Sequence, residues 1–209
     1  MGPHRHTPLD PSNRTNRRHL LAVSGTAIAS TLAGCTGAGS RIRTRSLDPE
    51  TTEEDDATHL TFRHDETRIA EVTLSDRWLR AHHRATYPIR TNVWHADGTT
   101  LDRLRYEFHP VATDHPPELY LERPGGSPWE PIEFARGDDP ETTVLEIPDL
   151  GFQGRGSVAL EFLVDPRTDD EFDLRVDVSA TVSSDRFFGR VYHLNGETTR
   201  TLPGYAYFE

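Results

Sequence analysis

The side chains that could do chemistry in this chain are mostly histidines and carboxylates. Its 209 residues include 11 His and 34 Asp or Glu, but only one cysteine, Cys35, and one methionine, Met1. From Cys35 onward, no two histidines have the i, i+2 or i, i+4 spacing that aims two rings of one element at one ion. The neighbours His82 and His83 diverge on a strand or a helix. We therefore expect no metal site and no cofactor.

An acidic segment, Asp165–Glu171, lies between two of the most regular predicted strands. Such loops supply oxygens to hard cations. This one lacks the alternate-position ligands and the glycine of a calcium-binding loop. We expect a solvated hairpin turn.

Signals of catalysis are weak. The serines show no nucleophile-elbow pattern, and no glycine-rich phosphate loop follows a predicted strand. Carboxylates are too abundant for any two to be singled out as a general acid and a general base. We expect no catalytic residue, and a protein that is not an enzyme.

Three tryptophans are candidates for ligand binding: Trp78, Trp94 and Trp129. Trp129 lies in the proline-rich segment 124–131, and the other two lie near predicted early strands. Exposed aromatic rings can stack on sugar rings, whereas buried rings would close the ends of a hydrophobic core. Both readings stay open at this point.

The N-terminal segment predicts export. Arg17 and Arg18 precede the apolar run Leu20–Ala33, which is too short and too polar for a confident membrane span. The arginine pair resembles a twin-arginine signal, and Leu32–Cys35 resembles a lipobox. Cleavage before Cys35 would remove residues 1–34 as a signal peptide and leave the thiol to carry a lipid.

Assigning Cys35 to a lipid excludes other chemistry. Cys35 is the only thiol, and Met1 leaves with the signal peptide. A blue-copper centre needs a cysteine thiolate and usually an axial methionine, so the mature chain cannot form one. The mature chain also has no disulfide, and its hydrophobic core alone must stabilise it.

The charge balance is strongly acidic. The formal net charge is −11, and the chain contains no lysine. Four Arg and one Asp precede Cys35, which leaves 19 arginines and 33 acidic residues in the mature part. Nucleic-acid binding is disfavoured because phosphate recognition needs a basic surface.

Acidity, the absence of lysine, the arginine pair and the lipobox together resemble the exported lipoproteins of halophilic archaea. This resemblance implies a protein on the outside of the cell membrane, anchored by a lipid on Cys35. An ordinary acidic protein encoded by a GC-rich genome is the alternative.

Residues 35–57 are rich in glycine, arginine and acidic side chains, so we expect a disordered tether. From residue 58 to 209 we expect a single domain, because the dominant period becomes two, as in strands. The clearest example is Phe172–Val182. Hairpins are predicted at Asp65-Glu66, at Ala96–Thr99 and at Asn195-Gly196.

These signals predict an all-β, antiparallel two-sheet sandwich of about nine or ten strands. An immunoglobulin-like arrangement fits best, with one short helix possible near residues 75–84. The expected function is that of a non-catalytic binding or structural module of the cell envelope. The alternative is a carbohydrate- or cation-binding accessory domain of an envelope enzyme or transporter. No motif identifies the envelope protein or glycan that would be the partner.

Overall fold

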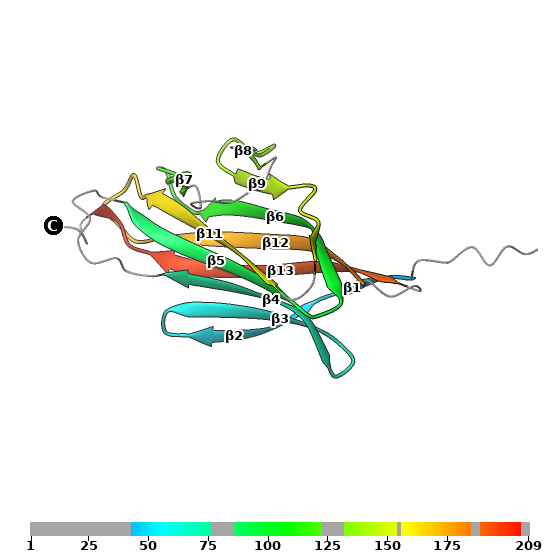
Figure 1. The fold of residues 1–209 in the computed structure, drawn as a ribbon. Helices are drawn as coiled ribbons and strands as arrows, with labels where there is room; N and C mark the ends of the chain where they lie inside the picture. Colours follow the sequence, from blue (N-terminus) through cyan, green and yellow to red (C-terminus); the bar gives the residue numbers. More distant parts are fainter. Residues whose placement is uncertain (1–42, 77–85, 123–131, 154–155, 185–188, 206–209) are drawn as a thin grey trace, which may run out of the picture. The chain divides into compact units, whose positions relative to one another are not determined.

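The computed structural model describes residues 43–76, 86–122, 132–153, 156–184 and 189–205. These residues form thirteen strands in two sheets (Figure 1). Within these ranges, no helix has the length and apolar character needed to cross a membrane. The predicted all-β, two-sheet sandwich is confirmed, with more strands than the expected nine or ten.

Sheet A has seven strands, in the order β1-β13-β12-β6-β9-β8, with β10 also paired to β6. Its pairs are antiparallel except for β1 and β13, which run parallel. The strands are β1 (Arg43–Leu47), β6 (Thr99–Val111), β8 (Glu133–Arg136), β9 (Thr143–Ile147), β10 (Phe152–Gln153), β12 (Phe172–Ser184) and β13 (Arg190–Leu202).

Sheet B has six strands, in the order β2-β3-β4-β5-β11-β7, and all its pairs are antiparallel. The strands are β2 (Pro49–Glu54), β3 (Ala57–His64), β4 (Thr67–Asp76), β5 (Tyr87–His95), β7 (Glu118–Glu122) and β11 (Gly156–Asp165). The predicted hairpin at Asp65-Glu66 is confirmed, because it joins the paired strands β3 and β4.

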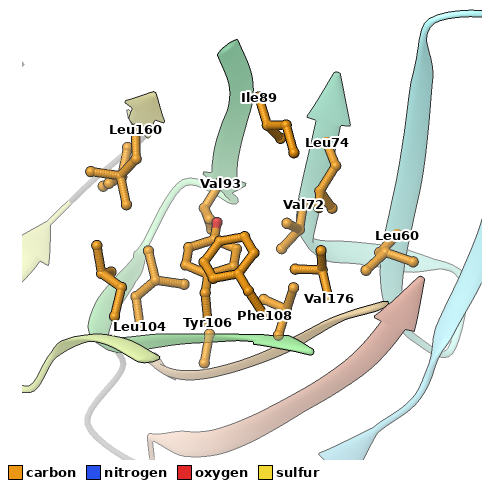
Figure 2. Packing of buried hydrophobic residues seen from close by; sticks show 14 of the residues in the cluster. Leu60, Val72, Leu74, Ile89, Val93, Leu104, Tyr106, Phe108, Leu160 and Val176 are labelled. Atoms are coloured by element: carbon orange, nitrogen blue, oxygen red, sulfur yellow. The ribbon is translucent and has the colours of Figure 1, made fainter. Parts of the chain in front are cut away.

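The hydrophobic core lies between the two sheets. Phe108 of β6 and Phe162 of β11 are fully buried, and their ring centroids lie 4.7 Å apart. Tyr106 stacks beside Phe108 at 6.1 Å and points toward Val93 of sheet B (Figure 2). Burial raises the pKa of the Tyr106 hydroxyl. Alternation along β12 puts every second residue from Phe172 into this core, as its period predicted.

The disordered tether expected over residues 35–57 is wrong for most of the residues that the structure describes, because they form strands. Arg43–Leu47 and Pro49–Glu54 form β1 and β2, which pair with β13 and β3. Their side chains are mostly exposed, so hydrophobic periodicity could not reveal them. The chain changes sheets at Asp48, and residues 35–42 of the expected tether lie outside the described residues.

The hairpin predicted at Asn195-Gly196 is wrong. Both residues lie inside β13, where Gly196 is opposite Val178 of β12. A Cβ atom at Gly196 would lie 3.0 Å from Leu60 Cδ1 and 3.2 Å from Pro49 Cγ. The glycine therefore lets β13 approach the other sheet closely, and it does not form a turn.

Two other expected hairpins are turns between sheets. Ala96–Thr99 does contain a turn, with Gly98 at φ 74°, but it leads from β5 in sheet B to β6 in sheet A. The acidic segment Asp165–Glu171 likewise leads from β11 to β12, in different sheets. Local turn signals marked where the chain reverses, but not which strands pair.

The short helix considered near residues 75–84 is not supported at its start, because Ser75 and Asp76 end β4. The rest of that segment lies outside the described residues.

β1 covers only part of the edge of β13. Its register runs from Arg190 to Leu194, and in the described structure nothing is paired along that edge beyond Leu194. Arg200 lies on the inner face of this second half, opposite the buried Leu174. Its Nη1 donates a hydrogen bond to Thr58 Oγ1 of sheet B at 3.2 Å.

Candidate functional site

A row of three carboxylates crosses the outer face of sheet A. Asp177 of β12 lies opposite Glu107 of β6 on one side and Glu197 of β13 on the other. Directly opposite residues of antiparallel strands face the same side, and like charges in such pairs are destabilising. This acidic row therefore needs cations close by.

Neighbouring rows place basic side chains against the acidic row. Arg105 Nε lies 2.9 Å from Glu107 Oε1, and His109 Nε2 lies 3.0 Å from Asp177 Oδ2. Arg175 Nε lies 3.4 Å from Asp177 Oδ1 and 3.9 Å from Glu197 Oε2. Each carboxylate of the acidic row thus contacts a basic side chain of the same sheet.

Glu146 of β9 extends this network. It accepts hydrogen bonds from Arg103 and from Arg105, whose Nη1 lies 2.7 Å from Glu146 Oε2. Burial alone would raise the pKa of the Glu146 carboxyl, but the hydrogen bonds from Arg105 and Arg103 outweigh it and lower the pKa. The carboxylate is 14% exposed, so solvent screens the contacts only in part.

Glu146→Gln should lower the free energy of unfolding by about 1–2 kcal/mol at pH 7, because two charged hydrogen bonds are weakened. The pKa of Glu146 is lower in the folded chain, so its contribution is complete above the ordinary carboxyl pKa and vanishes as the pH falls through the lowered value. Urea unfolding should therefore show a smaller difference between the variant and the wild type at pH 3 than at pH 7. The exposed Glu133, opposite Glu146 on β8, supplies the control Glu133→Gln. An equal loss for Glu146→Gln at both pH values would contradict this assignment.

His109 connects three elements through both ring nitrogens. Its Nδ1 lies 2.9 Å from Thr142 Oγ1, just before β9, and its Nε2 faces Asp177 on β12. The Nδ1 contact is a hydrogen bond with the hydroxyl, whereas Nε2 lies close to the carboxylate without the geometry of a hydrogen bond. The result is a carboxylate–imidazole–hydroxyl relay.

Two hollows open beside this network. The first, here the β8 hollow, has a volume of about 560 Å³ and lies among β6, β8, β9 and the β8–β9 turn. Five carboxylates and two arginines line it, together with His109, Thr142 and the apolar Ala135 and Val144. The second, here the β13 hollow, has about 700 Å³, and the acidic row lines it with Ser179, Asn195 and Pro49.

The relay contains the kinds of side chain found in a hydrolytic triad, but a substrate could not reach its hydroxyl group. Thr142, in the place of a nucleophile, is only 3% exposed. A hydroxyl so deeply covered cannot meet a substrate carbonyl in the geometry that acyl transfer requires. The relay is suited to holding β6, β12 and the start of β9 together, and the hollows offer a polar surface for contact.

Of the residues predicted to bind ligands, only Trp94 lies in the described part of the chain. It is half-buried on β5, and the Arg68 guanidinium lies 4.2 Å from its ring centroid. One ring face is therefore covered by a cation–π contact. Trp78, Trp129, Arg17, Arg18 and Cys35 lie outside the described residues.

The histidines are spread over both sheets. Across the described ranges, no group of three or more His, Cys, Asp or Glu is placed to hold a metal ion. His59 faces Glu54 and Glu71 of sheet B, whereas His193 lies on the outer face of β13.

The network on sheet A was not identified from the sequence, although its residues carried a signal. Arg103, Arg105 and Glu107 alternate with buried residues on β6, as Arg175 and Asp177 do on β12. The pattern showed that these side chains face outward. The pairing of β6 with β12 aligns them into rows, and it joins segments far apart in the chain.

Comparison with known proteins gives one family match. A family model described as "Domain of unknown function (DUF8121)" matches residues 43–204, which include all thirteen described strands. No curated protein matches the sequence.

Solved structures with some likeness share only the general architecture. A type I cohesin–dockerin complex from Clostridium thermocellum has a TM-score of 0.35 at 10% identity, over 55% of this chain and 83% of that chain. A type I cohesin from Pseudobacteroides cellulosolvens has a TM-score of 0.33 at 13% identity, over 54% and 80%. A collagen-binding domain from a Staphylococcus aureus adhesin reaches 0.27 at 7% identity, over 56% and 92%. Scores this low carry no argument about what the present chain binds.

Proposed function

The chain belongs to the family described as Domain of unknown function (DUF8121), and for this member we propose a non-catalytic binding module held outside the cell membrane by a lipid on Cys35. The observation that carries the anchor is Leu32–Cys35, which follows an arginine pair and an apolar run at the expected spacing. Lipidation would hold the sandwich near the membrane surface.

The outer face of sheet A is the proposed binding surface. It combines two adjacent hollows with polar side chains that the ion-pair network holds in place. Binding surfaces gain affinity when such groups are ordered before the partner arrives. Envelope proteins and glycans both offer the polar groups that this surface would meet.

The accessory-domain alternative has less support. Stacking of a sugar on Trp94 would compete with Arg68 for one ring face. A cation at the acidic row would have to displace Arg105, His109 or Arg175, which already lie against it.

Cys35→Ser should abolish anchoring, because the hydroxyl cannot take the place of the thiol that is lipidated. We expect the protein in the medium or as an unprocessed precursor, measured by fractionating cells and weighing the intact protein. The matched variant Cys35→Ser with Ser40→Cys restores a thiol outside the Leu-Ala-Gly context and should not restore anchoring. Protein of mature size that remains in the membrane fraction with Cys35→Ser would refute the anchor.

Cross-linking tests the binding surface. With Cys35 lipidated, a new cysteine is the only free thiol. Ala135→Cys places it in the β8 hollow, and Ser157→Cys places it on the exposed outer side of sheet B. A thiol-directed photo-cross-linker should give discrete adducts in intact envelopes from position 135 and not from position 157. Adducts from both positions, or from neither, would contradict the assignment to sheet A.

A further inference from the structure

The first strand is held to the domain by few contacts. Of its five residues only Leu47 is buried, and the other four are exposed. The strand pairs with β13 alone and in parallel, which is slightly less stable per residue than antiparallel pairing. Side-chain contacts from β1 therefore contribute a large share of what keeps it in place.

One of these contacts depends on the protonation state of a histidine. Arg45 Nη1 of β1 lies 3.0 Å from Nε2 of His64, whose side chain is 9% exposed at the end of β3. Arg190 Nη1 of β13 lies almost equally far from both nitrogens of the same ring, at 3.2 Å from Nε2 and 3.3 Å from Nδ1. Guanidinium groups only donate hydrogen bonds, so Nε2 must carry no hydrogen for the Arg45 contact to form.

The remaining neighbours of the ring are two carboxylates and a tyrosine. Asp65 Oδ2 lies 3.3 Å from Nδ1 and can accept its hydrogen. Tyr192 of β13 packs against the ring at a centroid distance of 5.5 Å, edge to face. Asp97, from the β5–β6 turn, lines the same cleft of about 500 Å³ as His64, Asp65 and Arg190.

Protonation of His64 would remove the acceptor that holds Arg45 of β1. A hydrogen on Nε2 turns the acceptor into a donor that faces two other donors, and it adds a third positive charge beside Arg45 and Arg190. The Asp65 carboxylate lies close to Nδ1, but it is 80% exposed and is screened by water. Arg45 can relieve the conflict by turning to solvent, which removes its hold on β1.

We propose that β1 is an acid-sensitive strap, which leaves β13 when His64 becomes protonated. Histidine is the side chain whose ordinary titration range lies between about pH 5 and 8. Release would add five extended residues, about 17 Å, to the link between the sandwich and Cys35. Only this lengthening of the anchor rests on the proposed lipid attachment; detachment of β1 does not.

Hydrogen–deuterium exchange tests the proposal on the full chain carrying Cys35→Ser, which needs no lipid. Peptides covering β1 and β6 are compared at pH 7.5 and 5.0, with exchange times scaled for the intrinsic pH dependence. Protection of β1 should fall about tenfold on acidification, while β6 stays protected.

His64→Gln should remove this pH response, because the amide stays uncharged at both pH values and its oxygen can still accept from Arg45. The control is His193→Gln, at an exposed histidine opposite Ser46 of β1, which should keep the response. The proposal is overturned if wild-type β1 keeps its protection at pH 5.0, or if His64→Gln loses it to the same extent as the wild type. If His193→Gln also abolishes the pH response, the response does not depend on His64 alone, and the proposal is contradicted.

Discussion

Phe108→Ala lowers the free energy of unfolding by about 3–5 kcal/mol, the range found for removing a large aromatic side chain from a packed core. Phe108 is fully buried and meets Phe162 of the opposite sheet at a centroid distance of 4.7 Å. The substitution therefore opens a cavity between the two sheets and removes a favourable contact between rings. Equilibrium unfolding in guanidinium chloride measures the loss.

The same substitution at the edge of sheet A provides the comparison. Phe134 of β8 is 37% exposed, so Phe134→Ala should cost less than about 1 kcal/mol. Phe108→Leu, which keeps most of the volume, should cost about 1.5 kcal/mol or less. If Phe108→Ala and Phe134→Ala differ by less than about 1 kcal/mol, the core is not where the structure places it.

Gly204→Ala is the second large effect, with an expected loss of about 2–3 kcal/mol, high in the usual range for single substitutions. A Cβ atom here would lie 2.5 Å from the carbonyl oxygens of Asp169 and Asp170. These are backbone atoms, so rotation of a side chain cannot relieve the clash. The segment after β13 must move away and give up the 2.8 Å hydrogen bond from Tyr205 N to Thr168 O.

Gly98→Ala separates crowding from backbone conformation. Gly98 has φ 74°, and nothing lies within 4 Å of an added Cβ. Its cost comes only from placing an L-residue in the left-handed region, about 1–2 kcal/mol. Thermal unfolding of both variants, with limited proteolysis of the Asp165–Glu171 segment, distinguishes the two causes. Increased cleavage there is expected for Gly204→Ala alone, and an intact segment in that variant would contradict the clash.

The parts of the fold that could be predicted from the sequence are those set by local periodicity. Along β12, buried and partly exposed residues alternate from Phe172 to Val182, because a strand on a half-buried sheet needs this pattern. β1 and β2 could not be found in this way. Their side chains are exposed, and pairing of their backbones with β13 and β3 makes them strands.

Turn signals failed where tertiary pairing prevailed over them. Asn195-Gly196 has a strong hairpin preference, but β13 continues through both residues because it pairs with β12 from Val191 to Leu202. The candidate site shows the same limit. That Glu107 and Asp177 face outward follows from alternation, whereas their side-by-side position follows from the pairing of distant strands.

The inward position of Arg200 has a consequence for how copies of this chain meet at high concentration. Within the described residues, the edge of β13 beyond Leu194 has no paired strand, and its backbone hydrogen-bonding groups could be extended by a strand of another molecule. A continuous sheet formed there would enclose the Arg200 guanidinium and its contact with Thr58 in a layer without water. Burying that charge is costly, so the arginine acts as a gatekeeper against edge-to-edge aggregation.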